Sequence, residues 1–158
     1  MSAHIIAGFP GIGKSFVARN SALSVRDSDS SSFSWRGTER HPDFPHNYIR
    51  HIQDHLNDYD VILVSSHAEV RDALREAGLA YTLVYPATGQ RDDYVERYIR
   101  RRSPASFIQM VRDRFDPWLT ECRAETHPTH VVLERGQYLH DVLDGIVSTT
   151  SNDQTPYT

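Results

Sequence analysis

Short apolar runs alternate with stretches of helical spacing along the whole chain. Aliphatic runs predict five strands at 4–7, 23–26, 60–66, 81–85 and 130–134, with the 60–66 segment the clearest. Helical patterns predict helices at 15–20, 48–56, 68–77, 92–102 and 138–147. Ser103-Pro104 predicts the start of another helix that runs to about Phe115, and Asp116-Pro117 repeats that signal. The polar segment 30–47 contains Pro42 and Pro45 and is predicted to be irregular.

Strands separated by helices are typical of an α/β protein with a parallel sheet, and we expect three layers and five strands. The length of 158 residues favours one domain, which we place at 1–147. The Ser/Thr-rich segment 148–158 is expected to be a disordered tail.

The strongest motif is Gly8-Phe9-Pro10-Gly11-Ile12-Gly13-Lys14-Ser15, which fits the phosphate-binding pattern G-x-x-x-x-G-K-[ST]. It stands between a predicted strand and a predicted helix, as this pattern requires. Glycines let the backbone N–H groups turn toward phosphate oxygens, and the helix N-terminus adds a partial positive charge. Lys14 would reach the β- and γ-phosphates, and Ser15 would bind Mg²⁺. ATP and Mg²⁺ are therefore the expected cofactors, and the expected nucleotide-binding residues are Gly8, Gly11, Ile12, Gly13, Lys14, Ser15 and Phe16.

Charge and composition limit the kinds of protein in which this site could stand. The formal charge of −4 excludes a generally cationic DNA-binding protein. Of 17 basic residues, 16 are arginines, and Lys14 of the motif is the one lysine. A single cysteine, Cys122, permits no internal disulfide, and no apolar run approaches the ~18 residues of a membrane span. With no secretory signal at Met1-Ser2-Ala3-His4, we expect a cytoplasmic protein without membrane association, and no obligate protein partner is indicated.

Ligands of parallel sheets bind beyond the carboxyl ends of the strands, so polar residues there are candidates for function. Asp27 and Asp29 follow the second predicted strand. A carboxylate in this position could accept the proton of an acceptor hydroxyl or hold Mg²⁺ through water, whereas the alternative is a turn or a helix cap. We take Asp27 as the catalytic candidate and Asp29 as the metal and substrate candidate. Ser65-Ser66-His67 follows the third strand without an acidic residue, which argues against a motor ATPase, and His67 is a candidate substrate contact.

The segment 91–114 is locally basic, with seven arginines and four acids. Arginines stabilise the charge on a transferring phosphoryl group, and we single out Arg97 and Arg101, which share a helix face. The alternative is a solvated face with salt bridges to neighbouring acids. Aromatic residues of the irregular stretch could stack on a base or could pack the loop; these are Phe33, Trp35, Phe44 and Tyr48, of which Phe33 and Trp35 are the substrate candidates. A zinc site at His46, His51 and His55 is disfavoured because no cysteine or H-E-x-x-H motif accompanies it.

The pattern resembles the P-loop kinases of the nucleoside monophosphate kinase group. The resemblance rests on the segment Gly8–Ser15, on Asp27 and on the Arg-rich helix after the fourth strand. Tyr85-Pro86, the run from Arg91 to Tyr98, Arg101, Phe107-Ile108 and Trp118 further resemble small phage-type kinases that include 5-hydroxymethyluridine DNA kinase. The resemblance implies a P-loop kinase fold with the kinase strand order and a short lid around 87–104. It also implies that Asp27 is the general base, that Arg97 and Arg101 are lid arginines and that Arg135 lies near the adenine.

Three functions remain open. The first is an ATP-dependent kinase for a nucleic-acid component, with the hydroxymethyl group of 5-hydroxymethyluracil in DNA as the expected acceptor. The second is a kinase for free (deoxy)nucleoside monophosphates. The third is a non-catalytic nucleotide-binding regulatory module, although the chain lacks the N/T-K-x-D signature of GTPases. The expected partner is accordingly a nucleotide or DNA substrate.

Overall fold

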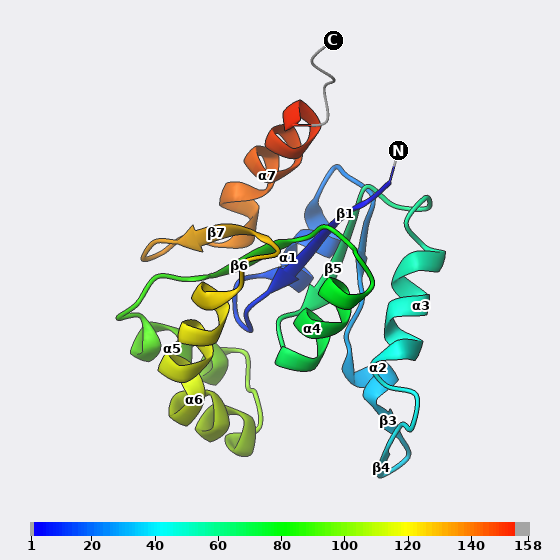
Figure 1. Cartoon of the computed structure of the whole chain (residues 1–158). Coiled ribbons are helices and arrows are strands. Elements are labelled where there is room, and N and C mark those ends of the chain that lie inside the picture. The colour runs from blue at the N-terminus through cyan, green and yellow to red at the C-terminus, as the bar shows by residue number, and fades with distance from the viewer. Residues whose placement is uncertain (1, 154–158) are drawn as a thin grey trace.

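A computed structural model describes residues 2–153 as a three-layer α/β fold around a five-stranded sheet (Figure 1). All strand pairs in this sheet are parallel. The strands follow the order β2 (Val25–Asp27), β5 (Val61–Ser65), β1 (His4–Gly8), β6 (Thr82–Pro86), β7 (Thr129–Leu133). The first strand therefore lies at the centre, so the phosphate-binding loop begins in the middle of the sheet edge. The predicted fold class and the five predicted strands are confirmed.

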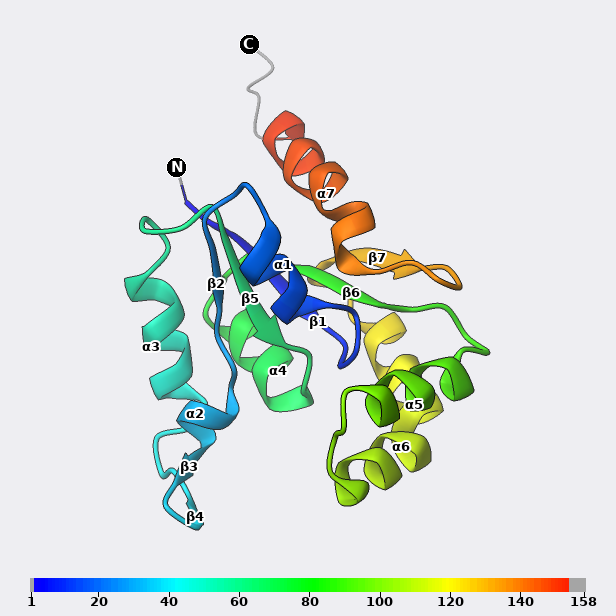
Figure 2. The ribbon, with the colours of Figure 1, turned by 180° about the vertical axis from the view of Figure 1, so that it is seen from behind.

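Helices cover both faces of the sheet (Figures 1 and 2). Helices α1 (Lys14–Asn20) and α7 (Leu139–Asp153) lie on one face, and α4 (Ala68–Glu76) and α6 (Ala105–Ala124) lie on the other. Helix α3 (His46–Asp54) packs beside α4, and α5 (Arg91–Arg100) packs against α6. None of these described helices combines the length and the apolar character that a membrane span needs.

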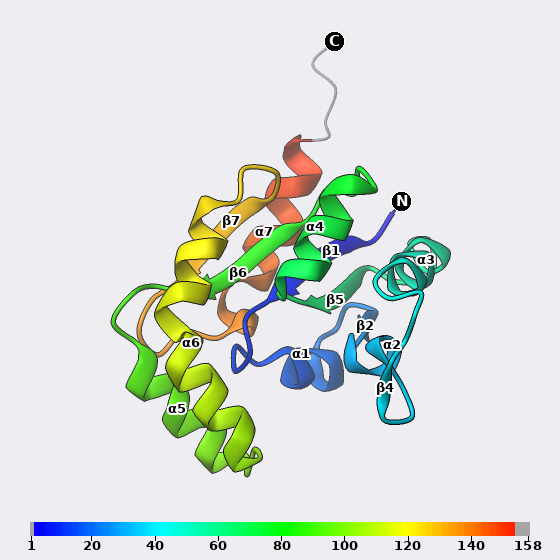
Figure 3. The ribbon, with the colours of Figure 1, turned by 60° about the horizontal axis from the view of Figure 1, so that its bottom comes forward.

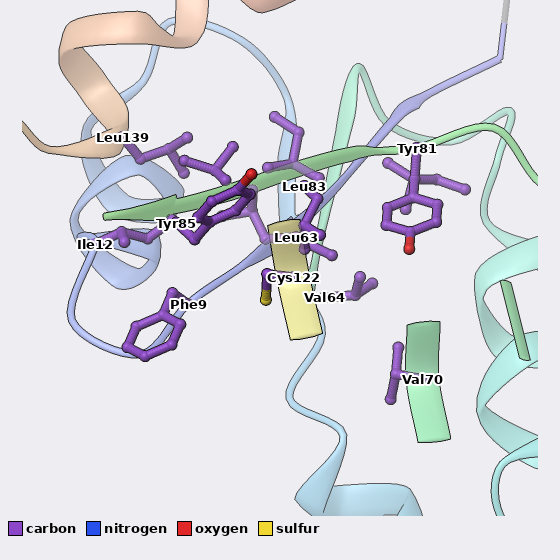
Figure 4. Packing of buried hydrophobic residues seen from close by; sticks show 14 of the residues in the cluster. Phe9, Ile12, Leu63, Val64, Val70, Tyr81, Leu83, Tyr85, Cys122 and Leu139 are labelled. Atoms are coloured by element: carbon purple, nitrogen blue, oxygen red, sulfur yellow. The ribbon is translucent and has the colours of Figure 1, made fainter. Parts of the chain in front are cut away.

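Aliphatic side chains of the central strands form the core. Val61, Ile62, Leu63 and Val64 of β5 are fully buried, which explains why this segment is continuously apolar in the sequence. Figure 4 shows side chains from the strands, from α4, α6 and α7 and from the loop after β1 packed in one cluster. Cys122, the one cysteine, is buried in this cluster.

The segment 30–47 is more regular than the sequence predicts. It contains α2 (Ser31–Ser34) and a small hairpin of β3 (Trp35–Arg36) and β4 (Glu39–Arg40), and its last two residues begin α3. Gly37 adopts a φ of +67° in the turn, a conformation that glycine accepts without steric cost. Strands of two residues carry no hydrophobic periodicity, so the pattern could not reveal the hairpin. Figure 3 shows this hairpin on one side of α1 and the α5–α6 pair on the other.

Helix boundaries differ from expectation at two places. The helix predicted to end near Phe115 continues through Pro117 to Ala124, so the second start signal at Asp116-Pro117 is wrong. Proline inside a helix costs about 3 kcal/mol. Here Val111, Phe115, Trp118, Leu119 and Cys122 bury one stripe of the continuous helix, which offsets that cost.

The closing helix, predicted to end at Val147, extends to Asp153. Positions 148–153 of the expected tail thus continue this helix, and positions 154–158 lie outside the described residues.

Candidate active site

The phosphate-binding loop turns sharply between β1 and α1, and its glycines are sterically required. Gly11 and Gly13 adopt φ values of +91° and +94°. A Cβ atom on Gly11 would lie 2.8 Å from Cε1 of Tyr98, and one on Gly8 would lie 2.6 Å from Cδ1 of Ile12. A larger residue at Gly11 is thus excluded both by backbone conformation and by the side chain packed beneath it.

Two apolar residues of the loop anchor it to the protein. Phe9 and Ile12 are fully buried. The Phe9 ring lies 5.3 Å from Phe115 and 4.7 Å from Trp118, both on α6. Ile12, predicted to bind nucleotide, instead buries its side chain in the core, and its carbonyl oxygen accepts a hydrogen bond of 2.8 Å from the N–H of Leu139 at the start of α7. Phe9 thus fastens the loop to α6, and Ile12 fastens it to α7.

Lys14 lies across the mouth of the loop. Its Nζ donates a hydrogen bond of 2.9 Å to the carbonyl oxygen of Gly8, with a longer contact of 3.5 Å to that of Phe9. Burial of the ammonium group lowers the pKa of Lys14 to about 8, while the neighbouring Asp27 opposes this shift. The loop carbonyls carry no negative charge, so an anion bound beside Lys14 would stabilise its buried ammonium group.

Ser15 and Asp27 bring two oxygen ligands together. Ser15 Oγ donates a hydrogen bond of 3.3 Å to Asp27 Oδ2. Asp27 is the last residue of β2 and not, as the sequence suggested, the first residue after it. Hydroxyl and carboxylate oxygens are the ligand types that Mg²⁺ prefers, so this pair fits the ion.

Asp29 forms a turn, the structural alternative to a role in catalysis or metal binding. Its Oδ1 accepts a hydrogen bond of 2.9 Å from the backbone N–H of Ser31, which forms a turn before α2. Asp29 still lines the same cleft as Asp27. It combines a local structural contact with a position from which it could bind a metal through water.

Two clefts meet at the phosphate-binding loop. The first has a volume of about 650 Å³ and extends from the loop toward Asp27, the hairpin and the start of α4. The second, of about 520 Å³, lies between α1, α5 and Tyr138. The residues that line both clefts are Lys14, Ser15 and Arg101.

The charges of the two clefts differ. The second cleft is lined by five cationic side chains and, among the described residues, by no carboxylate; these cations are Lys14, Arg19, Arg97, Arg100 and Arg101. The first is mixed, with three cationic and three acidic side chains, which are Lys14, Arg40, Arg101, Asp27, Asp29 and Glu69. The second cleft is therefore suited to a polyanion such as a triphosphate, and the first to a ligand of lower charge.

The two predicted lid arginines are held differently. The guanidinium of Arg97 donates hydrogen bonds to the carbonyl oxygens of Gly11 (2.9 Å) and Gln137 (3.4 Å). It also lies between the rings of Tyr94 and Tyr138, 4.1 and 3.9 Å from their centroids. Arg97 thus fastens α5, the helix expected to form the lid, to the phosphate-binding loop.

Arg101, by contrast, is exposed at the end of α5. Its Nε donates to Ser103 Oγ at 3.0 Å, and its guanidinium lies over the rings of Tyr98 and Phe107 at 5.1 and 5.7 Å. No ion pair holds Arg101 within the described part of the chain, and it lines both clefts. Of the two, Arg101 has the freedom to contact a phosphoryl group between the clefts.

The remaining predicted residues divide into those at the clefts and those elsewhere. Trp35 and His67 line the first cleft, and Phe16 lines the second. Phe33 instead packs against Tyr48 and His51 in the core next to the hairpin. Arg135 forms an ion pair with Asp93 and lines neither cleft.

The histidines 46, 51 and 55 do not form a metal site. His51 Nε2 and Ser28 Oγ are hydrogen-bonded at 3.0 Å, and His55 Nδ1 donates to the carbonyl oxygen of His51 at 2.8 Å. Among the side chains that the structure describes, from residue 2 to 148, no group of three or more His, Cys, Asp or Glu is placed to hold a metal ion. A magnesium ion in the cleft would thus depend on phosphate oxygens in addition to protein ligands.

Sequence reasoning missed several cleft residues. Arg40 lies in the segment predicted to be irregular, where no pattern singled it out, whereas Phe44, one of the aromatic residues considered for stacking, does line the first cleft. Glu69 and Phe107 stand in the first turns of their helices and line the first cleft, and Tyr138 lines the second. Glu69 alone had a usable signal, because it follows a strand end by only four residues.

Comparison of the sequence with models of protein families and with curated proteins finds no match. The functional assignment therefore rests on the fold and on the geometry of the two clefts.

Proposed function

We propose that this protein is an ATP-dependent P-loop kinase that transfers the γ-phosphoryl group to a hydroxyl of a nucleic-acid component. The hydroxymethyl group of 5-hydroxymethyluracil in DNA is the first acceptor to test. One observation carries the proposal: the two clefts share Lys14, Ser15 and Arg101. Such an arrangement suits a reaction between two bound substrates, whereas a regulatory nucleotide switch needs only one site.

Each cleft has a role in this proposal. The cationic second cleft binds the donor, with Lys14 and Arg101 facing its phosphates. The first cleft binds the acceptor, with Asp27 among the residues that line it. Mg²⁺, when bound, neutralises charge on the phosphate oxygens, and Ser15 with the carboxylate of Asp29 would hold it, which leaves the Asp27 carboxylate free to accept a proton.

The chemistry of transfer follows from these positions. The acceptor hydroxyl oxygen forms a bond to the γ-phosphorus, the bond to the leaving diphosphate breaks, and Asp27 accepts the hydroxyl proton. Lys14 and Arg101 stabilise the negative charge that spreads over the transferring group. Arg97 holds the loop in position through the Gly11 carbonyl.

A transfer screen with γ-labelled ATP tests this function. Acceptors are 5-hydroxymethyldeoxyuridine, (deoxy)nucleoside monophosphates and DNA that contains 5-hydroxymethyluracil. We expect label on the DNA. Label on the monophosphates would favour a free-nucleotide kinase, and ATP binding without transfer to any acceptor would favour a regulatory module and overturn the kinase proposal.

The Asp27→Asn variant tests the proton acceptor. We expect kcat to fall about 10²–10⁴-fold while the affinity for ATP is retained, because the amide cannot accept the proton. Near-normal transfer by a folded variant would remove Asp27 from this role. Asp72→Asn, at an exposed ion pair on α4, is a matched control that should keep full activity.

A further inference from the structure

Arg40 stands at the edge of the first cleft, in a setting that restrains its guanidinium. It lies on β4 of the hairpin, where it pairs with Trp35 of β3. Its guanidinium carbon is 5.4 Å from the centroid of the Trp35 ring and 5.1 Å from that of Phe44. Contact with two aromatic rings orients the planar group while its N–H donors stay available at the edges.

A weak ion pair occupies this guanidinium. Arg40 Nη2 lies 2.8 Å from Glu69 Oε1, which links the hairpin to the first turn of α4. The side chains are 49% and 57% exposed, and one nitrogen–oxygen contact joins them. Exposed pairs of this kind add little stability, so an anion with better geometry can displace the Glu69 carboxylate. A phosphate group is such an anion, because it accepts two parallel hydrogen bonds from one guanidinium.

The other two cationic side chains of the first cleft are shared with the second cleft. Lys14 and Arg101 also line the second cleft, where the donor phosphates are placed. Among the lining residues, Arg40 is the cationic side chain that belongs to the first cleft alone. A negative charge on the acceptor itself would therefore meet Arg40.

We propose that Arg40 selects acceptors that carry their own phosphate group, by exchanging Glu69 for that phosphate. The site then takes a nucleotide, free or within a polynucleotide, and discriminates against nucleosides. Trp35 is a positioning residue that orients Arg40 and presents its uncovered ring surface to the acceptor base. This inference rests on the proposed function, because it assigns the first cleft to the acceptor.

Calorimetric titration without ATP tests the inference separately from catalysis. The probes are 5-hydroxymethyldeoxyuridine, its 5′-monophosphate and a single-stranded oligonucleotide that contains one such base. For Arg40→Ala, we expect affinity for the phosphate-bearing probes to fall about 10–100-fold, as for lost hydrogen bonds to a charged group. Affinity for the nucleoside should change by less than about twofold, since exposed substitutions away from a contact have small effects.

The Glu69→Gln variant distinguishes recognition from a structural latch. If Glu69 competes with the acceptor phosphate, its neutralisation should raise affinity for the phosphate-bearing probes about 2–5-fold. If the ion pair only holds the hairpin closed, both variants should weaken binding. Arg75→Ala, which removes an exposed ion pair on the same helix outside the clefts, is the matched control and should bind like the wild type.

Each outcome decides the inference. If Arg40→Ala loses affinity for the monophosphate, the 5′-phosphate of a nucleotide is the group that Arg40 binds. If it loses affinity for the oligonucleotide alone, that group is a backbone phosphate of a polynucleotide. Equal losses for the nucleoside and its monophosphate, unchanged binding by Arg40→Ala, or weaker binding by Glu69→Gln would overturn the inference. So would a wild-type protein that shows no preference for the phosphate-bearing probes. A failure of phosphoryl transfer alone would count against the proposed function and not against the role of Arg40.

Discussion

At the residue scale, Lys14 and Gly11 of the loop hold unusual states for different reasons. Lys14 holds a charge in a buried setting that disfavours it, which costs stability in the free protein. Gly11 holds a backbone conformation that glycine adopts without steric cost, so the cost falls on any residue that replaces it. Substitution of Lys14 should therefore raise the stability of the fold, and substitution of Gly11 should lower it.

Lys14→Met should abolish transfer yet stabilise the fold at neutral pH. Burial lowers the Lys14 pKa from 10.5 to about 8, so folding carries the cost of a buried charge at pH values below about 8. The cost disappears as pH rises from about 8 toward 10.5, where the lysine is neutral in both states. We expect the variant to gain about 1–3 kcal/mol of unfolding free energy at pH 7 and to lose that advantage by pH 10. Urea unfolding at both pH values measures this, and an advantage that grows with pH would contradict it.

Gly11→Ala should lose stability and ATP affinity together. The added Cβ would approach Tyr98 to 2.8 Å at a backbone φ of +91°. We expect a loss of about 2–4 kcal/mol in unfolding free energy, from strain and overpacking combined. Gly78→Ala is the control: its φ is +69°, but no atom lies within 4 Å of the added Cβ. Thermal unfolding should show a clearly smaller loss for Gly78→Ala; equal losses would mean that the contact with Tyr98 is unimportant.

At the element scale, α5 carries one arginine that is fixed to the loop and ends at another that is exposed at the clefts. Arg97, in the middle of the helix, is fixed by two carbonyl oxygens and two tyrosine rings, whereas Arg101 at its end is exposed. The sequence places both arginines on one face but cannot tell which of them is held. The contacts that hold Arg97 come from Gln137 and Gly11, about 40 and 90 positions away in the sequence.

The variants Arg97→Ala and Arg101→Ala should therefore differ. We expect Arg97→Ala to lower the free energy of unfolding by about 1–3 kcal/mol, because it leaves carbonyl oxygens of the loop unpaired. Arg101→Ala should leave stability within about 0.5 kcal/mol and lower kcat about 10²–10³-fold. Chemical denaturation with steady-state kinetics measures both effects. The reverse pattern would assign the structural role to Arg101.

Elements were predictable where local pattern and tertiary packing agree. The buried run at Val61–Ser65 and the motif from Gly8 to Ser15 could be identified directly, because apolar continuity and glycine spacing are local properties. The hairpin of Trp35 and Arg40 is too short for any periodicity, and the path of α6 through Pro117 depends on distant packing partners. The clefts were hidden for the same reason, since they assemble from segments far apart in the chain.

At the scale of the whole molecule, cationic side chains gather in one cleft although the net charge of the protein is negative. The protein carries a formal charge of −4, yet its second cleft gathers five cationic side chains without a lining carboxylate among the described residues. The overall charge gives a polynucleotide no general electrostatic attraction, so cationic contacts would have to come from local groups such as those of the two clefts. Binding should rest on few phosphate contacts.

A polynucleotide acceptor should show a moderate dependence on salt. With about two or three phosphate contacts, the slope of log K against log salt concentration should be about −1 to −2 for a single strand. The affinity for a nucleoside should hardly change over the same range. Fluorescence titration from 50 to 300 mM salt, roughly the range where counterion release is resolved, measures these slopes. A slope steeper than about −5 would indicate an extended cationic track that this charge distribution does not provide.

The position of Arg101 on both clefts has a thermodynamic consequence for the order of binding. A ligand in either cleft that draws this guanidinium toward itself changes the electrostatic free energy available to a ligand in the other. By reciprocity, the factor by which the donor alters acceptor affinity must equal the factor by which the acceptor alters donor affinity. Two substrates that compete for the Arg101 guanidinium should weaken each other's binding before transfer. During transfer both would share it, so the same cation would stabilise the transition state.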